Sequence, residues 1–488
     1  MARSIAPASS PSTQARLGIV TSRFLPDLGG VQTHVAETTQ RLLALGWQVT
    51  IITGVGSDGG IAKQQPWQWQ PDASHPSRSA TIIPIHYDAI VGVGLLQIWW
   101  QVLQTLPVLS KATVIHAHDV LWWLFPARLV LPLARVVLTM HGWEGRFPIP
   151  ARLKFIKQLG AVLADKVMAI GDYIGHYYGI RPDCVSYGAV SNQILAALPT
   201  THSKSTSHHR LKVAYVGRLA ADTGLGEMLA AVPFLTQHEW HFYGDGPLRA
   251  ACEQWGKVHG WTATKPWLTD ADILIGSGYL SVWEALLAGK QVVVYANNQL
   301  KVDYFKRAPF AGYIKLTTNR DEFIAACTPP RTAHAEAQAL ARSNATRALA
   351  QDQQWDKIVE TYQGWYQEIQ AWSWWQLFTR RWQHLRLTKQ DLLQGFGRFL
   401  LTYLVSMFGL VMISGVCLWL GIAGSGQLTS RQQLLATANQ TATVASVLTA
   451  HQLMPIELLK KSSSTLLGIT QLADQVTQVD TTHQPNQP

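Results

Sequence analysis

The chain has 488 residues, of which 47% are hydrophobic and 14% are charged, so it is long enough for two or three domains and most of it can bury a core. Its formal net charge of +10 would suit nucleic acid or an anionic membrane surface, but the lysines and arginines are dispersed and no nucleic-acid motif is present. Four widely spaced cysteines form no CxxC pair, which supports neither a zinc site nor a disulfide framework and fits a reducing compartment.

The first part of the chain repeats a strand–helix pattern. Residues 1–15 lack an apolar core long enough for a signal peptide, and we expect a disordered N-terminus there. A strand over 17–22, a helix over 31–45 and a strand over 47–53 form one βαβ unit, which predicts a parallel sheet. Further along we expect a surface loop over 55–80, a helix over 95–109 and strands over 113–119, 136–142 and 166–170. Residues 16–196 are therefore predicted to form one Rossmann-like domain, with its ligand at the carboxyl ends of the strands.

A polar linker over residues 197–210 separates this domain from a second one. The strand–helix pattern restarts there and predicts a smaller Rossmann-like domain over 211–350, facing the first across a cleft. Its expected elements are strands over 211–217, 240–244, 271–276 and 291–296 and helices over 224–232 and 248–259. Residues 351–372 read as a long helix that could pack back across the junction of the two domains.

The C-terminal region has the pattern of a membrane anchor. Residues 373–398 are rich in tryptophan and arginine, typical of a helix in the membrane interface, although an ordinary surface helix is the alternative. Residues 399–422 carry no charge over a length that spans a hydrocarbon core of about 30 Å, which favours a transmembrane helix over a buried helix of a soluble domain. Only Arg431 lies close behind this segment, whereas five basic residues precede it: Arg380, Arg381, Arg386, Lys389 and Arg398. The positive-inside rule therefore predicts cytoplasmic domains and an exoplasmic tail over 423–488.

A glycine-rich turn precedes a short helix in the second domain. Gly276 and Gly278 leave the turn almost free of side chains, so its backbone N–H groups could face a ligand. Ser281 and Glu284 have the spacing of a capping box, and a helix N-terminus behind a glycine turn suits a phosphate. Glu284 could instead accept hydrogen bonds from a ribose, or the two residues could merely cap a helix.

Two other groups of polar residues are open to more than one interpretation. His116 and His118 lie on one face of their strand and, with Asp119, could form a metal site, but they fit loop residues near an acceptor better. Asp270 and Asp272 superficially resemble a metal-binding DxD motif, but their place just before a buried strand favours a role as a cap or loop.

Several short motifs resemble, in their order and spacing, those of family-4 glycosyltransferases of the two-domain GT-B type. The resemblance covers residues 16–370 and rests on the motifs LGIVTSRFLPDLGG, VIHAHD, VVLTMHG, VSYGAV, VAYVGRL, FYGDGPLR and SVWEALLAGKQVVV. It implies an α/β fold with two Rossmann-like domains, and a nucleotide-diphosphate sugar bound mainly by the second.

The resemblance also implies roles for individual residues. Arg218, Glu284 and His141 would be catalytic: Arg218 would bind the diphosphate, Glu284 the ribose, and His141 would lie beside the transferred sugar. An ordinary structural role is the alternative for Arg218 and for His141. The other donor-binding positions would be Gly29, Gly30, Asp245, Pro247, Gly276, Ser277, Gly278, Tyr279 and Leu280, with His118, Asp119 and His141 on the acceptor side. No cofactor or metal is required if Arg218 and the helix N-terminus neutralise the diphosphate.

Two positions depart from the family's pattern. Gly276 stands where the family usually has a glutamate that touches the sugar, and Thr223 stands about where it has a lysine that touches the diphosphate. We therefore expect altered donor binding or a loss of activity, and favour an active enzyme, because the turn reads as a coherent variant.

The sequence as a whole favours a membrane-anchored glycosyltransferase that moves a sugar to a lipid-linked or glycan acceptor, with retention of configuration implied by the resemblance. The alternative is a non-catalytic membrane scaffold on a degenerate GT-B body. A sugar-nucleotide epimerase is a third option, but a soluble metabolite needs no membrane anchor.

Overall fold

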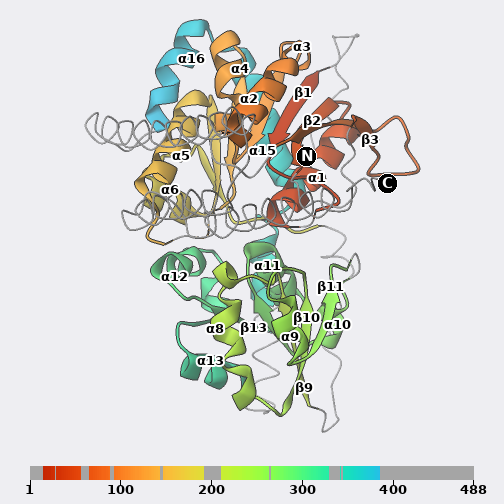
Figure 1. Cartoon of the computed structure of the whole chain (residues 1–488), viewed down its shortest axis with the longest axis vertical. Helices are drawn as coiled ribbons and strands as arrows, with labels where there is room; N and C mark the ends of the chain where they lie inside the picture. The colour runs from red at the N-terminus through yellow and green to blue at the C-terminus, as the bar shows by residue number, and fades with distance from the viewer. Residues whose placement is uncertain are drawn as a thin grey trace, which may run out of the picture. The chain divides into compact units, whose positions relative to one another are not determined.

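The computed structural model describes residues 15–27, 29–55, 65–87, 93–142, 145, 147–191, 210–262, 265–328, 341 and 344–384. They form two α/β units with parallel sheets, as the repeated strand–helix pattern predicts (Figure 1). The predicted transmembrane segment 399–422 and the tail 423–488 lie outside the described residues. No helix within the described ranges is both long enough and apolar enough to span a membrane.

The first unit is built on an eight-stranded sheet in the order β3-β4-β2-β1-β5-β6-β7-β8. All its pairs are parallel except β3 with β4. Its elements are β1 (Arg16–Thr21), α1 (Gly30–Ala44), β2 (Gln48–Val55), β3 (Trp67–Trp69), β4 (Ala80–His86), α2 (Val93–Gln104), α3 (Leu106–Leu109), β5 (Val114–His118), η1 (Leu121–Leu124), α4 (Phe125–Val130), β6 (Val136–Met140), α5 (Ala151–Leu163), β7 (Lys166–Ile170), α6 (Asp172–Tyr178) and β8 (Cys184–Ser186). Every residue of β5 and β6 is buried, as expected for central strands covered by helices on both faces.

Two expectations for this unit are corrected. The predicted surface loop over 55–80 contains an edge strand, β3, whose Trp67 and Trp69 pair with β4. The predicted helix over 95–109 is two helices, α2 and α3, separated at Thr105. Pro107 lies in the first turn of α3, where its missing N–H costs nothing, and it cannot continue α2.

The second unit is a six-stranded parallel sheet in the order β11-β10-β9-β12-β13-β14. Its elements are β9 (Leu211–Val216), η2 (Ala221–Thr223), α8 (Leu225–Leu229), η3 (Val232–Phe234), β10 (His238–Tyr243), α9 (Arg249–Glu253), β11 (Lys257–Gly260), α10 (Trp267–Asp270), β12 (Ile273–Gly276), α11 (Tyr279–Leu287), β13 (Gln291–Tyr295), α12 (Gln299–Lys306), η4 (Ala311–Tyr313), β14 (Lys315–Thr317) and α13 (Arg320–Cys327). The predicted helix over 248–259 is wrong in its second half, which forms β11. Gly256 allows this because its α-carbon passes so close to the Trp240 carbonyl that a side chain would clash.

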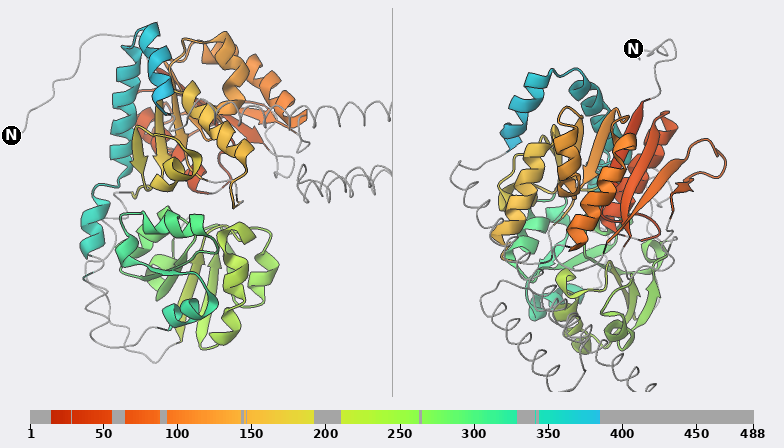
Figure 2. Two further views of the ribbon diagram at one scale, coloured as in Figure 1. Left: turned by 90° about the vertical axis from the view of Figure 1, so that its left-hand side faces the viewer. Right: turned by 45° about the horizontal axis from the view of Figure 1, so that its top comes forward.

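The chain then returns to the first unit through α15 (Trp355–Gln370), α16 (Trp374–Arg381) and η5 (Trp382–His384). Figure 2 shows α15 and α16 beside the helices that cover the eight-stranded sheet. The buried face of α15 carries Tyr362 and Tyr366, both fully buried, and joins the hydrophobic core that contains β1 and α1. The predicted interfacial segment 373–398 is described only as far as residue 384, where α16 exposes Trp374 and Trp375.

Candidate functional site

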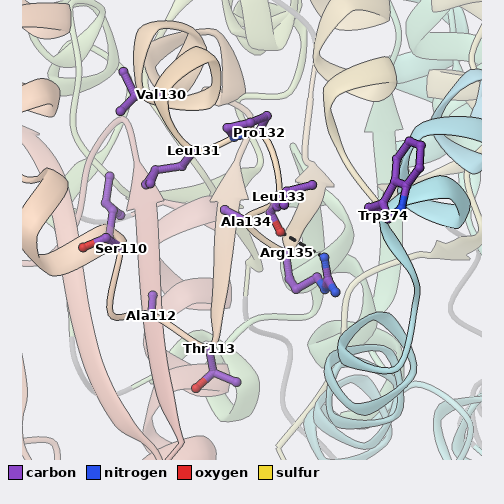
Figure 3. Close-up of a pocket in the computed structure, with 11 residues that line it drawn as sticks. Ser110, Ala112, Thr113, Val130, Leu131, Pro132, Leu133, Ala134, Arg135 and Trp374 are labelled. Carbon is purple, nitrogen blue, oxygen red and sulfur yellow. Dashed lines mark hydrogen bonds between the residues drawn. The ribbon is translucent and has the colours of Figure 1, made fainter.

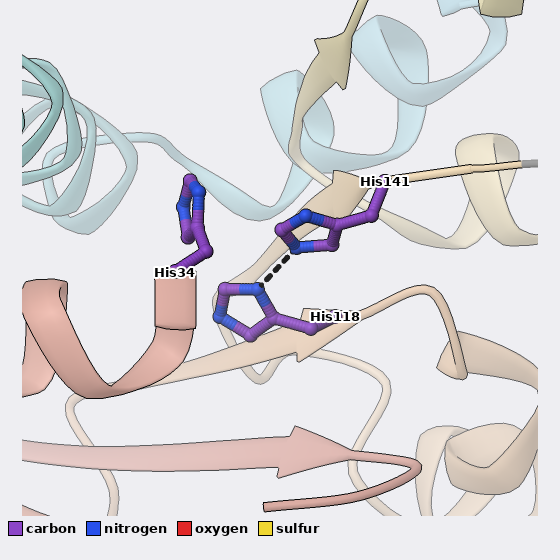
Figure 4. A group of neighbouring side chains, drawn as sticks. All are labelled: His34, His118 and His141. Atoms are coloured by element: carbon purple, nitrogen blue, oxygen red, sulfur yellow. Dashed lines mark hydrogen bonds between the residues drawn. The ribbon is translucent and has the colours of Figure 1, made fainter. Parts of the chain in front are cut away.

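Histidines gather at the carboxyl ends of the central strands of the first unit. His118 ends β5, His141 follows β6, and His34 reaches the same place from α1 (Figure 4). His118 Nδ1 and His141 Nε2 share a hydrogen bond of 2.9 Å, and the His34 ring lies edge-on to the His141 ring with a centroid distance of 4.7 Å. The strand alternation predicted from the sequence puts His116 on the same face, where its ring stacks on His118 at 4.3 Å. The sequence pointed to His118 and His141 here, but not to His34.

Helix α15 places two tyrosine hydroxyls against this histidine group. Tyr366 Oη lies 2.7 Å from His116 Nδ1, and Tyr362 Oη lies 2.8 Å from His34 Nε2. Thr139 connects these two tyrosine–histidine pairs, because its hydroxyl bonds both His116 Nε2 and Tyr362 Oη. Burial lowers the pKa of His116 to about 3 and holds those of His34 and His118 well below the ordinary value. The imidazoles are therefore neutral at pH 7.

Asp119 accepts a hydrogen bond from the His141 backbone and is itself paired with a lysine. Its Oδ1 accepts a hydrogen bond of 3.0 Å from the His141 backbone N–H and one of 2.7 Å from Lys157 Nζ. Burial alone would raise the pKa of Asp119, but the Lys157 ammonium and the hydrogen bonds from Lys157 and from the His141 backbone outweigh it and keep that pKa below its ordinary value. Burial lowers the pKa of His141 to about 4, although Asp119 opposes the shift. His141 is therefore a neutral, half-buried imidazole suited to hydrogen bonding with an uncharged sugar.

The coordinating atoms of His34, His118 and His141 lie within 4.8 Å of one another, the separation at which three ligands could share a metal ion. Three nitrogens of this group already form hydrogen bonds within the protein, namely His34 Nε2, His118 Nδ1 and His141 Nε2, and His118 Nε2 is buried without a hydrogen-bond partner. The sequence predicts no metal here, and that remains a prediction.

In the second unit, Arg218 follows β9 and lies beside the loop that follows β12. β9 and β12 are neighbouring parallel strands in which Gly276 lies opposite Val216. The loops that follow these two strands therefore start side by side. A side chain at Gly217 would overlap the Ser277 hydroxyl, which shows how closely the two loops approach. The Arg218 side chain is exposed and forms an ion pair with Asp222. Because the Arg218 side chain lies in solvent, its ion pair with the half-buried Asp222 is weak, and Arg218 can exchange it for a ligand anion.

The glycine-rich turn leads into α11 earlier than predicted. The helix begins at Tyr279 with Gly278 as its N-cap, so the capping box of Ser281 and Glu284 is wrong. Tyr279 sets this start: its ring stacks on Tyr304 at 4.0 Å and its N–H donates to the Tyr304 hydroxyl. The Ser281 hydroxyl donates back to the Gly278 carbonyl instead of capping an N–H. One backbone donor of the turn is therefore already used.

Glu284 lies in the middle of α11 and not in its first turn. The side chain is buried, and Lys265 forms an ion pair with its Oε1. Burial raises the pKa of Glu284, while the Lys265 ammonium opposes that shift. A ribose that bound Glu284 would therefore have to share this carboxylate with Lys265 or displace the lysine.

The remaining predicted residues occupy the edges of the two units. Gly29 is the N-cap of α1 and Gly30 is its first residue, with open space around a side chain at Gly30. Asp245 follows β10 and pairs with Arg249 at 2.9 Å, next to the exposed Pro247. Leu280 packs on the first unit, 3.0 Å from where a side chain at Gly188 would lie.

Part of the sequence matches a known family, and the fold is similar to that of solved glycosyltransferases. Residues 28–183 match the family described as Glycosyltransferase Family 4. A solved glycosyltransferase from Rickettsia africae ESF-5 shares the fold with a TM-score of 0.53 and 13% identity, covering 74% of this chain and 100% of its own. Alr3699/HepE from Anabaena, solved in complex with UDP and glucose, has a TM-score of 0.50 and 15% identity, covering 71% of this chain and 98% of its own. No curated protein matches the sequence.

The chain has the GT-B fold. This fold and the family match over the first unit together support a glycosyltransferase. In this glycosyltransferase the loop after β6 meets the loop after β9: a side chain at Gly145 would lie 3.4 Å from Asp222 Cβ. The structure thus brings the region of His141 toward Arg218 and the turn after β12. Two other predicted donor-binding residues form ion pairs within the protein: Glu284 pairs with Lys265, and Asp245 pairs with Arg249.

Sequence reasoning missed three charged residues of this site. Lys157 fixes Asp119, Lys265 pairs with Glu284, and Lys301 donates a hydrogen bond of 3.2 Å to the Ser277 carbonyl. Each is separated from its partner by 19 to 38 residues in the sequence. The sequence gives a local indication only for Lys301: Asn298 is a good N-cap residue, and a helix that starts there has Lys301 in its first turn.

A separate apolar cavity of about 590 Å³ lies at the opposite edge of the eight-stranded sheet (Figure 3). Thr113 and Arg135, which precede β5 and β6, mark the amino ends of those strands. Leu133 and Trp374 line the cavity and are largely exposed. Because the histidines lie at the carboxyl ends of the same strands, this cavity is not part of the candidate glycosyl-transfer site.

Proposed function

We propose that this glycosyltransferase is membrane-anchored and moves a sugar from a nucleotide-diphosphate donor to a lipid-linked or glycan acceptor, with retention of configuration. One observation carries the proposal: Arg218 lies beside the turn after β12, while the loop that follows His141 reaches Asp222. A guanidinium next to a helix N-terminus favours a diphosphate. The neutral imidazole of His141 suits the uncharged sugar.

The proposed reaction needs no covalent bond to the protein. The bond between the sugar C1 and the diphosphate oxygen breaks, and its electron pair stays on the diphosphate. The acceptor hydroxyl oxygen bonds to C1 from the same face, and its proton passes to the departing phosphate. Arg218 would stabilise the charge that develops on the leaving group, a contribution commonly worth about 100-fold in rate.

The direct test incubates the purified full-length protein with a panel of nucleotide sugars and follows release of the nucleoside diphosphate. We expect one donor to be turned over and Arg218→Ala to lower kcat about 100-fold, as for loss of one charge-stabilising donor. Arg320→Ala, which removes an exposed arginine from α13, is the matched control and should leave kcat unchanged. If no donor binds or reacts, the proposal fails.

A non-catalytic scaffold remains the second candidate, because Lys265 occupies the Glu284 carboxylate and Gly276 offers no acid to a sugar. It predicts that no nucleotide sugar shifts the melting temperature and that the protein binds another membrane protein tightly. A donor-dependent rise in melting temperature that Arg218→Ala abolishes would exclude it.

A further inference from the structure

Lys301 is a buried lysine whose ammonium group lies against the turn after β12. Its backbone N–H donates 3.0 Å to the Asn298 side chain at the start of α12, which fixes the residue in the first helical turn. Only 6% of its surface is exposed, and its Nζ donates to the Ser277 carbonyl at 3.2 Å. The side chain therefore reaches from α12 into the loop region that also holds Arg218.

No carboxylate lies within ion-pair distance of Lys301 among the described residues. Asp222 and Arg218 are its charged neighbours, and Asp222 already pairs with Arg218. The ammonium also lies 5.2 Å from the centre of the Tyr304 ring. Two cations thus share one carboxylate, which leaves this corner of the protein with a net positive charge.

Holding this charge without a carboxylate partner is unfavourable for the unliganded protein. An ammonium has three donors, and burying it without a counter-charge is unfavourable because it loses its hydration. Burial accordingly lowers the pKa of Lys301 to about 8, with Asp222 opposing the shift and Arg218 adding to it. A methionine would fill the same space without burying a charge. The presence of a lysine at this position therefore indicates that its charge has a function.

Thr223 cannot supply the missing cation. Its hydroxyl accepts a hydrogen bond of 2.9 Å from Tyr215 and donates one of 2.7 Å to the Ala220 carbonyl, so it serves the loop's own structure. In this chain, the residue at the position where family 4 usually has a lysine therefore stabilises its own loop. A second positive charge for the diphosphate would have to come from another element.

We propose that Lys301 is the second cation of the diphosphate site: with Arg218 it binds the diphosphate of the donor and neutralises the leaving nucleoside diphosphate. This inference rests on the proposed function. Lys301 forms no bond to the sugar and transfers no proton. Its ammonium stabilises the negative charge that the diphosphate gains when the C1–O bond breaks, and a bound diphosphate in turn supplies the missing counter-charge.

The test measures binding of inorganic pyrophosphate and of UDP, GDP and ADP to the full-length protein by calorimetry. Pyrophosphate probes the site without reference to the base. We expect Lys301→Met to weaken pyrophosphate binding at least 10-fold and to flatten its dependence on salt. Lys306→Met is the matched control, since Lys306 is an exposed lysine on the same helix, and should bind like the wild type. Lys301→Arg, which keeps the charge, should retain most of the affinity.

A melting curve of each unliganded variant separates a binding role from a structural one. We expect Lys301→Met to melt at the same or a higher temperature than the wild type, because it removes a buried charge. If both Lys301→Met and Lys301→Gln fail to fold, the ammonium has a structural role and the inference is overturned.

The outcomes distinguish the inference from the proposed function. If Lys301→Met binds pyrophosphate as tightly as the wild type while Arg218→Ala does not, the diphosphate site stands and Lys301 has no part in it. If the wild type binds neither pyrophosphate nor any of the three nucleotides, the proposed donor site fails and the inference fails with it.

Discussion

Gly276 shows why one side chain of the family's pattern is absent. It ends β12 and is fully buried, and a side chain there would place its Cβ 2.6 Å from Val282 Cγ2. Val282 itself is fully buried on α11, so it has little space to move aside. The acid that family 4 usually has at this position could therefore enter only with a change at Val282. In the proposed donor complex, the sugar would therefore be held by other residues.

We expect Gly276→Ala to destabilise the protein by about 1–3 kcal/mol through overpacking, measured by urea denaturation. Gly278→Ala is the matched control from the same turn, since its new methyl group would have only the Tyr304 hydroxyl, at 3.7 Å, within 4 Å. Its cost should be well below that of Gly276→Ala. Val282→Ala should recover part of the loss in the double variant, because the two positions are in contact. Equal effects of the two glycine substitutions would contradict this account.

The sequence could indicate some residues of the candidate site but not the charges that complete it. Arg218, His118 and His141 can be recognised because each lies at the end of a strand or just after it, and the ends of parallel strands meet at one edge of a sheet. No such pattern in the sequence identifies Lys301 or Lys265. They reach their partners from other elements, and only the folded chain brings them together.

At the scale of elements, the central strands were predictable and the edge strands were not. β5, β6 and β12 are continuous buried runs, so their own composition reveals them. β3 and β11 are short, half-exposed strands that owe their form to pairing with a neighbour. The start of α11 was misplaced for a similar reason, because stacking between Tyr279 and Tyr304 outweighs the local capping signal.

The packing of α1, β5, β6 and α15 around four neutral histidines makes stability depend on pH. Their pKa values are lowered by burial in the folded protein, to about 3 for His116 and about 4 for His141, and return to about 6.5 when it unfolds. Below pH 6.5 the unfolded chain therefore binds more protons than the folded one, and the free energy of unfolding falls as the pH falls toward 4. Glu284 opposes this trend, since burial raises its pKa, but it is a single group.

We expect urea denaturation to show this loss between pH 6.5 and 4, with full stability retained above pH 7. Replacing His34, which is buried between α1 and α15, by glutamine should make the decline shallower. His176→Gln is the control, because His176 is an exposed histidine on α6 and should leave the pH profile unchanged. A wild-type profile that is flat over this range would show that the histidines are protonated in the folded state.

At the scale of the whole molecule, the two sheets are joined by specific contacts as well as by α15. Tyr177 donates 2.7 Å to Asp303, Arg307 pairs with Asp172 at 2.8 Å, and the Trp283 indole donates 3.0 Å to the Tyr187 carbonyl. One hydrophobic core contains buried residues from both sheets and from α15. The proposed donor site and the histidine group therefore belong to one packed body, as transfer between them would require.

The position of this body at a membrane is the last prediction. α16 exposes Trp374 and Trp375 and ends in Arg380 and Arg381, the composition of an interfacial helix, and the uncharged segment 399–422 follows it in the chain. The excess of basic residues before that segment predicts that the tail over 423–488 lies on the side of the membrane opposite the catalytic domains.

Protease digestion of sealed, inside-out vesicles tests this arrangement, with an epitope tag at the end of the tail. We expect the domains to be digested and the tagged tail to stay protected until detergent is added. A variant that replaces Arg386, Lys389 and Arg398 by glutamine and places lysines over 423–430 is the control. Its tail should become partly accessible, because the charge difference that orients the segment is reversed. Digestion of the wild-type tail without detergent would mean that the segment does not cross the bilayer, or crosses it in the other direction.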